Sequence, residues 1–317
     1  MKYCATLFFL LGFIIIQSVG AQTTSSEDTQ KLPVTGSELT SEAMGHNAFG
    51  MHMPQAPWLL TKIDAAEELL GREVNIVHWF GNWTYEFEAA PFENILASDR
   101  IPLFTWQAIH KPLDEIVSGI HDEYITHYAL ELSQFDEDVY IRLLPEMNGY
   151  WEPWNGDPET FITAWKHIVT LFRSTGAHNV KWVWAPNITD NPKTPENRLE
   201  VYYPGDDYVD VLGLSGYNWG IIQETTAWTS FEAIYAVPYE RLTSLSDKPI
   251  WIAEIASAEK GGNKSKWISN MLKSNAFPKI EAFIWFNELK EADWRFNSSP
   301  EALRAFTTWH EQNLDVE

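Results

Sequence analysis

Short apolar runs alternate with longer amphipathic stretches along most of this chain. The short runs are rich in β-branched and aromatic residues, as strands are, and there are eight of them: 47–52, 74–81, 101–107, 139–147, 180–187, 208–218, 249–256 and 280–288. Most intervals between them show a helical period, as in residues 158–176, which begin with a proline and end with a glycine. Eight strands alternating with helices predict an α/β protein folded as a single-domain (β/α)8 TIM barrel.

The competing arrangement is a doubly wound open sheet. Such a sheet usually carries a glycine-rich phosphate loop after its first strand. Residues 48–57, "AFGMHMPQAP", do not form one. The pattern therefore favours the barrel.

The N-terminal pattern differs from the rest. Residues 1–21 combine Lys2, an apolar run and a small-residue end at Val19, Gly20 and Ala21, which together predict a signal peptide. Residues 22–42 are polar without a period and predict a disordered leader, so the folded domain is expected at residues 43–317. We expect a secreted protein, extracellular or periplasmic, without membrane contact after signal removal. The alternative is that the apolar run stays as an anchor, although it is short for a membrane span.

Composition narrows the function classes. The only cysteine, Cys4, lies in the predicted signal, which excludes disulfides and thiolate catalysis from the mature chain. A net charge of −22 disfavours nucleic acid, anionic lipid and polyanionic substrates. The 16 tryptophans and 12 tyrosines supply aromatic faces, for the core or for stacking on sugar rings. We expect a monomer whose partner is a neutral polysaccharide.

Two carboxylates fall where barrel enzymes place their chemistry. Glu146 stands at the C-terminal end of the fourth apolar run and Glu254 at that end of the seventh. Side chains alternate along a strand, so each glutamate is expected to share a face with the residues two and four positions before it, namely Leu144 and Arg142, and Ile252 and Ile250. If both faces point to the barrel axis, the two carboxylates lie together over its mouth.

A close pair of carboxylates has a specific chemical use. Like charges resist ionising together, so one carboxyl keeps its proton while the other stays anionic. A proton donor beside an anionic nucleophile is what retaining glycoside cleavage requires. The alternative is an ion pair between Arg142 and a glutamate, without chemistry.

Other catalytic signatures are missing from the sequence. It contains no G-x-S-x-G, P-loop or H-E-x-x-H motif, and its nine histidines show no metal-ligand spacing backed by a third ligand. The acidic segments "NGDPET" and "YPGDDYVD" lack the alternating oxygen ligands of a calcium loop. We therefore expect no metal and no cofactor.

Several ordered blocks resemble glycoside hydrolase family 26. The likeness extends over residues 46–310 and rests on "RLLPEMNGYWEPW", "KWVWAPN", "YYPGDDYVDVLGLSGYN", "WIAEIAS" and "DWRF". The resemblance implies a (β/α)8 barrel and a retaining, cofactor-free enzyme. Most members are endo-β-1,4-mannanases, and some are mixed-linkage β-glucanases or β-1,3-xylanases. It also implies that Glu146 is the acid/base and Glu254 the nucleophile.

The same resemblance implies five substrate-binding residues. Tyr217 would hold the nucleophile, Trp151 would stack on a sugar beside the scissile bond, and Trp294, Arg295 and His78 would line the glycone side. Each has a structural alternative: a barrel tyrosine, core packing of a tryptophan, an ion pair of Arg295 with a nearby carboxylate, or a buried histidine with a backbone partner. The two tryptophans of "YWEPW" are also able to exchange roles.

Two positions depart from the family pattern and bear on specificity. Pro145 stands where the family usually has histidine, and Ser215 where many mannanases have aspartate. Both would lie near the sugar whose 2-hydroxyl distinguishes mannose from glucose. The expected activity is endo-acting hydrolysis of β-1,4-mannan, as in mannan, glucomannan or galactomannan. The alternatives are a mixed-linkage β-1,3-1,4-glucanase, a β-1,3-xylanase or a non-catalytic glycan-binding barrel.

Overall fold

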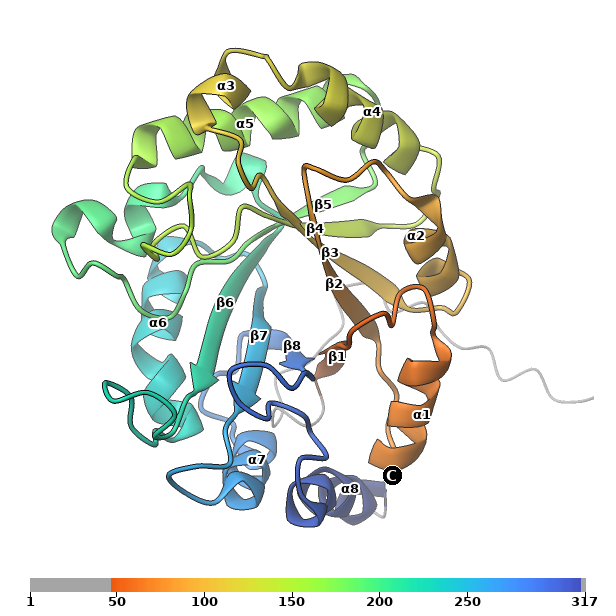
Figure 1. Cartoon of the computed structure of the whole chain (residues 1–317), viewed down its shortest axis with the longest axis vertical. Coiled ribbons are helices and arrows are strands. Elements are labelled where there is room, and N and C mark those ends of the chain that lie inside the picture. Colours follow the sequence, from red (N-terminus) through yellow and green to blue (C-terminus); the bar gives the residue numbers. More distant parts are fainter. Residues whose placement is uncertain (1–46, 315–317) are drawn as a thin grey trace, which may run out of the picture. The chain divides into compact units, whose positions relative to one another are not determined.

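Eight parallel strands pair in sequence order, and β8 pairs again with β1, which closes a barrel (Figure 1). This computed structural model describes residues 47–314, with side chains as far as residue 308. The strands are β1 (Ala48–His52), β2 (Ile76–Asn82), β3 (Ile101–Gln107), β4 (Val139–Leu143), β5 (Val180–Trp184), β6 (Val211–Asn218), β7 (Ile250–Ser257) and β8 (Ile280–Phe286). The predicted (β/α)8 barrel is thus confirmed. The predicted signal peptide (1–21) and leader (22–42) lie outside the described residues.

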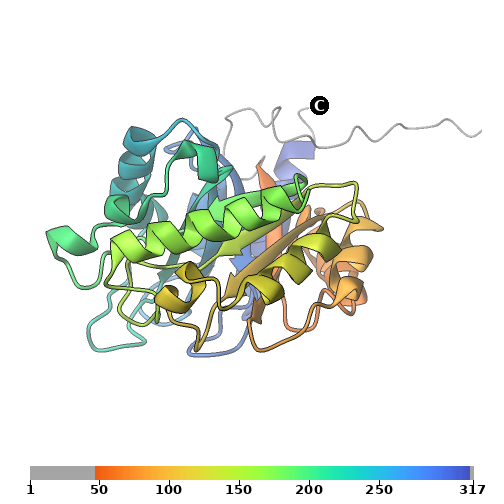
Figure 2. The ribbon, with the colours of Figure 1, turned by 90° about the horizontal axis from the view of Figure 1, so that it is seen from above.

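The helices surround the strands, as Figures 1 and 2 show. They are α1 (Thr61–Leu70), α2 (Ala89–Leu96), α3 (Leu113–Val117), α4 (Asp122–Leu132), α5 (Pro158–Ser174), α6 (Phe231–Leu245), α7 (Lys264–Lys273) and α8 (Pro300–Leu314). Three 3-10 turns connect β5 to β6, at Pro195–Asn197, Leu199–Tyr202 and Asp206–Tyr208. No helix of residues 47–314 has both the length and the apolar character to cross a membrane.

Helix α5 shows how particular residues determine where a helix begins and ends. Asp157 caps it by accepting the Thr160 N–H at 3.1 Å, and Pro158 occupies the first turn, where its missing N–H costs nothing. Gly176 follows the helix with φ 92°, a backbone conformation that side chains disfavour. The buried face of α5 includes Phe161 and Trp165.

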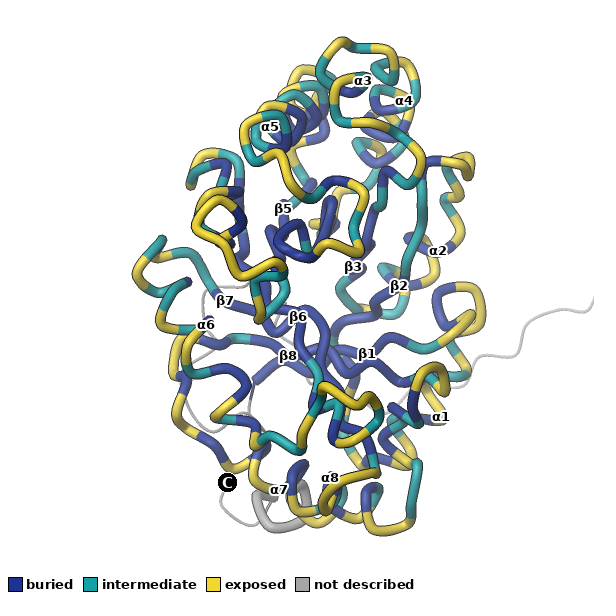
Figure 3. The backbone as a smooth tube through the Cα atoms, turned by 60° about the vertical axis from the view of Figure 1, so that its left-hand side comes forward, coloured by how far each residue is buried: buried dark blue, intermediate teal, exposed yellow. Residues whose placement is uncertain are grey.

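The core has two layers, and most strand residues in Figure 3 are accordingly dark blue. One cluster lies between the strands and the helices. The other fills the barrel interior and comprises Ala48, Ile76, Leu103, Val183, Ala185, Val211, Trp251, Ala253, Ala282 and Ile284. Gly50 lets this interior close, because a Cβ there would lie 2.7 Å from Cγ1 of Ile284. The packed interior leaves only the barrel's ends for a site.

Candidate active site

A cleft of about 1170 Å³ opens at the C-terminal ends of the strands. Every strand or the loop after it contributes to its lining, which includes His52, Phe80, Gln107, Glu146, Trp151, Asn187, Tyr217, Glu254, Phe286 and Trp294. This is the edge where barrel enzymes place their catalytic groups. The structure therefore brings both predicted glutamates into one cleft.

Glu146 reaches the cleft through a backbone reversal. Strand β4 ends at Leu143, earlier than the predicted run, and both Leu144 (φ 41°) and Glu146 (φ 55°) take left-handed conformations. Leu144 belongs to the outer cluster under the helices, so it does not share a face with Arg142 and Glu146 as strand alternation predicts. The reversal is secured by the Glu146 N–H, which donates to the carbonyl of Ala185 at 2.8 Å. Such strain in a non-glycine residue is typical of functional sites.

Glu254 reaches the cleft through a register shift in β7. Ile252 pairs with Leu214, but Glu254 pairs with Ser215, so Ala253 is an extra residue relative to β6. The face predicted for Glu254 was wrong, because Ile250 and Ile252 belong to the outer cluster while Ala253 lies in the interior. The extra residue turns Glu254 inward after Ala253, as β-bulges do when they redirect a side chain.

Arg142 lies under both carboxylates with only 1% of its side chain exposed. Its Nη1 pairs with Oε2 of Glu254, and its Nη2 lies 4.0 Å from Oε1 of Glu146 and donates to the hydroxyl of Ser215 at 2.5 Å. The ion pair between Arg142 and a glutamate, which the sequence offered as a purely structural alternative to a catalytic pair, is therefore present. It also supplies a positive charge where a carboxylate nucleophile would need one.

Tyr217 holds the other oxygen of Glu254. Its hydroxyl donates to Oε1 of Glu254, and its ring centroid lies 5.1 Å from that of Trp294. Burial, together with the charge of Glu254, raises the pKa of Tyr217 well above its usual value, so the phenol keeps its proton. Arg142 and Tyr217 thus fix Glu254 from two sides.

Glu146 lies in a different electrostatic environment. Burial, followed by the negative charge of Glu254, raises the pKa of Glu146 to about 7, against the opposing effects of Arg142, Trp151 and Asn187. The indole N–H of Trp151 donates to Oε2 of Glu146 at 2.7 Å. A carboxyl with this pKa retains a proton near neutrality and is able to transfer it.

The two tryptophans after Glu146 have separate places. Trp151 is 44% exposed and lines the cleft, whereas Trp154 is buried and donates its indole N–H to the Pro145 carbonyl at 2.8 Å. Trp294 is nearly buried but also lines the cleft, with its ring edge-on to Trp219 at 5.0 Å. Trp151 and Trp294 are therefore positioned to meet a ligand, as the resemblance implies.

Two predicted binding residues do not reach the cleft. Arg295 pairs bidentately with Asp293 at 2.8 and 2.7 Å, which matches the ion-pair alternative, and it is absent from the cleft lining. His78 is fully buried, with Nε2 2.7 Å from the hydroxyl of Thr105. Burial lowers the pKa of His78 well below its usual value. A sugar contact by Arg295, whose side chain is 44% exposed, stays a prediction from the resemblance, whereas fully buried His78 presents no surface to a ligand.

Sequence reasoning missed several cleft residues. His52 lines the cleft, stacks on Phe286 with 4.8 Å between ring centroids, and lies 3.5 Å from the carboxylate of Glu288. Asn187 and Glu152 also line it. His52 and Glu288 stand at the ends of predicted strands one and eight, so the end-of-strand rule applied to Glu146 would have found them.

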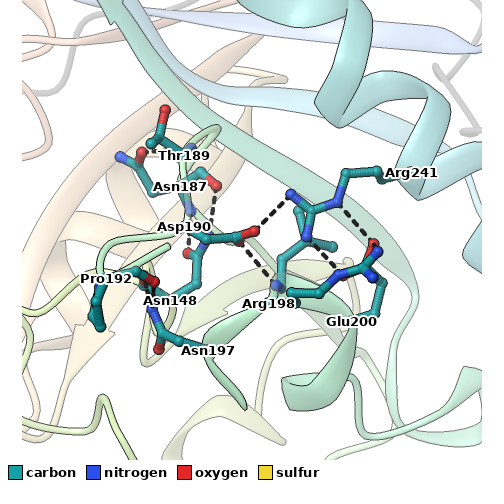
Figure 4. A network of polar contacts seen from close by, with 10 residues as sticks. Asn148, Asn187, Thr189, Asp190, Pro192, Asn197, Arg198, Glu200 and Arg241 are labelled. Atoms are coloured by element: carbon teal, nitrogen blue, oxygen red, sulfur yellow. Dashed lines mark hydrogen bonds and ion pairs between the residues drawn. The ribbon is translucent and has the colours of Figure 1, made fainter. Parts of the chain in front are cut away.

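A polar network supports the loops beside Glu146 (Figure 4). The amide of Asn148 donates to the carbonyl of Asn187 and to Asp190, both at 2.9 Å. Arg241 of α6 pairs with Asp190 at 2.9 Å and with Glu200 at 2.6 Å. The loops after β4 and β5 are thereby tied to α6, which limits movement of Glu146.

The described residues, 47–314, contain no group of three or more histidine, cysteine or acidic side chains arranged to hold a metal ion. The site geometry rests on carboxylates, a tyrosine, an arginine and aromatic rings. Two carboxyls in unequal environments, together with aromatic rings in a cleft at the C-terminal ends of barrel strands, are features typical of glycoside hydrolases.

The chain belongs to glycoside hydrolase family 26. The model of the family described as "Glycosyl hydrolase family 26" matches residues 101–283. Endoglucanase H of Acetivibrio thermocellus is 39% identical over 285 residues, which cover 84% of this chain and 31% of that protein. A mannan endo-1,4-beta-mannosidase of Bacillus subtilis strain 168 is 25% identical over 169 residues, 50% of this chain and 41% of that protein.

Solved structures share the fold. A β-mannanase from a symbiotic protist of the termite Reticulitermes speratus, complexed with gluco-manno-oligosaccharide, has a TM-score of 0.60 and 17% identity, covering 87% of this chain and 89% of that one. The catalytic domain of a Bacillus sp. JAMB-750 endo-β-1,4-mannanase has a TM-score of 0.64 and 15% identity, covering 84% and 86%. At this identity the likeness concerns the barrel alone.

Proposed function

We propose that this chain is an endo-acting, retaining hydrolase of a neutral β-linked polysaccharide. The observation that carries the proposal is the unequal pair of carboxyls. Glu254 is held by Arg142 and Tyr217, while burial raises the pKa of Glu146 to about 7. One group is thus prepared to attack and the other to give a proton.

The proposed reaction has two steps. Glu146 gives its proton to the glycosidic oxygen as Glu254 attacks the anomeric carbon, so the bond to the leaving sugar breaks and a glycosyl ester forms. Glu146, now ionised, then takes a proton from water as the water oxygen attacks the same carbon and releases Glu254. Two inversions give net retention. Tyr217 and Arg142 hold Glu254 in place throughout, and the Trp151 N–H orients Glu146.

Two independent observations support β-glucan as the first candidate substrate. Pro145 offers the cleft no polar side chain, and the Ser215 hydroxyl already accepts an N–H of Arg142. Neither position supplies the histidine or aspartate that the resemblance to mannanases would lead us to expect. The 39% identical relative is named an endoglucanase, although the chain spans only about a third of its length.

The second candidate is β-1,4-mannan, the substrate expected from the sequence. It is supported by the curated mannan endo-1,4-beta-mannosidases, which are 25–26% identical over half to two thirds of this chain. The chain spans 29–52% of the length of those relatives. A β-1,3-xylanase of Vibrio sp. matches a shorter stretch, 37% of this chain.

A panel of polysaccharides tests these candidates. Reducing-end release is expected to be greatest on barley mixed-linkage β-glucan, lower on glucomannan and galactomannan, and lowest on β-1,3-xylan. Short oligosaccharides should appear early, because an endo-acting enzyme cleaves inside the polymer.

Pro145→His should raise the mannan-to-glucan activity ratio if the missing imidazole sets the preference. Greater activity on mannan than on glucan would reverse the ranking, and binding without cleavage of any polymer would reject the hydrolase.

We also propose that the protein is secreted, on the strength of the signal-like residues 1–21, and that it is a monomer, as expected above. Expression of the full chain in a secreting bacterial host should yield a protein that begins at Gln22 by N-terminal sequencing. Size-exclusion chromatography with light scattering should give the mass of one chain. A protein retained in the cytoplasm with residues 1–21 intact would contradict the secretion proposal.

A further inference from the structure

Glu152 is a third carboxyl in the cleft, and the two-step reaction gives it no role. It lies six residues after Glu146 and lines the same cleft. Among the described side chains of residues 47–308, that of Glu152 makes no hydrogen bond or ion pair, and it is partly buried. A partly buried carboxyl that lines a cleft and has no protein partner is free to bind a ligand there, which gives an otherwise costly arrangement a physical reason.

The backbone around Glu152 is firmly held. Its N–H donates to the Gly149 carbonyl at 3.1 Å, and its own carbonyl accepts the Asn155 N–H at 3.1 Å. Trp154 anchors the turn in the core through its bond to Pro145. The side chain of Asn155 adds a bond to the Met147 carbonyl at 2.8 Å. Glu152 is therefore presented from a rigid turn, which suits recognition of a ligand group at a fixed place.

The turn lies on the leaving-group side of the reaction. Glu146 must face the glycosidic oxygen that departs with the leaving sugar, and Trp151 is bonded directly to Glu146. Tyr217 and Trp294 stand on the wall formed after β6 and β8, next to the proposed nucleophile. Glu152 follows Trp151 and so belongs with the acid rather than with the nucleophile.

We propose that Glu152 binds a hydroxyl group of the leaving-group sugar and so determines which acceptor and leaving sugars the enzyme accepts. The inference rests on the proposed glycoside hydrolase function and adds the recognition group on this side of the cleft. Trp151 supplies an apolar face for the pyranose, and Glu152 supplies the polar contact at its edge. This pairing of a ring face with a hydrogen-bonding edge is the usual way in which proteins bind sugars.

The electrostatics of Glu152 agree with this role. Burial, and then the negative charge of Glu146, raises the pKa of Glu152 to about 8. At neutral pH the group is mainly a neutral carboxylic acid, which both donates and accepts hydrogen bonds. It therefore matches a sugar hydroxyl without adding a negative charge beside that of Glu254.

Two substitutions and two kinds of leaving group test the proposal. Glu152→Leu should lower kcat/KM on oligosaccharides of the preferred polymer by about tenfold or more, because a sugar hydroxyl loses its partner in a partly buried place. The same variant should stay within about twofold of wild type on an aryl glycoside, whose leaving group has no sugar hydroxyls. Glu152→Gln should keep most of the oligosaccharide activity. Glu159→Leu, at an exposed glutamate in the first turn of α5, is the matched control and should change neither.

A second measurement uses the step in which the glycosyl ester is broken down. A sugar acceptor that attacks the glycosyl ester in place of water must occupy the leaving-group side. Glu152→Leu should therefore form less transglycosylation product at high oligosaccharide concentration, with an unchanged thermal midpoint. Equal losses on both substrate types, or no loss on either, would overturn the inference alone. Absence of any hydrolysis by wild type across the polysaccharide panel would overturn the proposed function and the inference with it.

Discussion

Replacing Glu254 by alanine is expected to lower kcat by roughly 10⁴-fold or more on polysaccharides and aryl glycosides alike, because removal of a nucleophile costs at least that much. No other described carboxylate of the cleft is held by both Arg142 and Tyr217. The variant should stay folded, since alanine leaves a small cavity at the barrel mouth. Initial rates on both substrate types, with circular dichroism as the folding control, measure the effect.

The covalent step predicts a label on the same residue. An activated 2-fluoro glycoside slows both steps but keeps ester formation faster than hydrolysis, because fluorine destabilises the oxocarbenium-like transition state. Mass spectrometry of the digested wild type should find one added sugar on the peptide that contains residues 249–260, with fragment ions placing it on Glu254. Glu259 lies in the same peptide but accepts bonds from the hydroxyls of Ser298 and Ser299, so it should stay unlabelled. A label on Glu259 or Glu146, or a product that first appears with inverted configuration, would contradict the assignment.

Replacing Glu146 by alanine is expected to separate substrates by leaving group. A sugar leaving group needs a proton, so activity on polysaccharide should fall by about 10²–10⁴-fold. Formation of the ester from an aryl glycoside with an acidic phenol should fall far less, since that phenolate leaves unaided. Pre-steady-state release of the phenol measures this step directly. Equal losses on both substrates would remove Glu146 from the role of acid.

The same substitution should alter the pH profile. Since burial raises the pKa of Glu146 to about 7, the protonated acid predominates below that pH and disappears above it. Wild-type kcat/KM on polysaccharide should therefore decline as pH rises through about 7. Glu146→Ala should lack that decline on the aryl substrate. Persistence of the decline in the variant would assign it to another group.

The sequence predicted the barrel and the two glutamates because those features depend on local patterns. Each strand is a short apolar run between turn residues, and Glu146 and Glu254 each stand at the end of one. The directions in which the strand side chains point were not predicted correctly. The extra residue in β7 depends on pairing with β6 and β8, and the left-handed turn at Leu144 depends on a bond to a neighbouring strand. Neither the extra residue nor the left-handed turn changes the pattern of apolar and polar residues in its own segment, so the pattern does not reveal them.

The role of a side chain could be predicted where a contact with a residue nearby in the sequence determines it. It could not be predicted where packing against distant parts of the chain determines it. Arg295 pairs with the aspartate two residues before it, an outcome visible as an alternative in the sequence. The burial of His78 depends on Thr105 of the next strand. Arg142 was seen only as a possible ion-pair partner, and its contact with Ser215 joins β4 to β6 across the barrel. The contacts of His78 and Arg142 link positions far apart in the chain, which a single sequence does not pair.

The direction in which the Glu254 side chain points depends on the number of residues before it in β7, because one extra residue shifts the register with β6. Ala253 contributes no chemical group and lies fully buried in the barrel interior. Its deletion would keep every catalytic residue in the gene and yet rotate Glu254 toward the helices. A homologue that retains the glutamate but loses one position before it would therefore be inactive despite a complete set of motifs. In this chain, the number of residues between Ile252 and Glu254 matters for the site as much as the identity of Glu254.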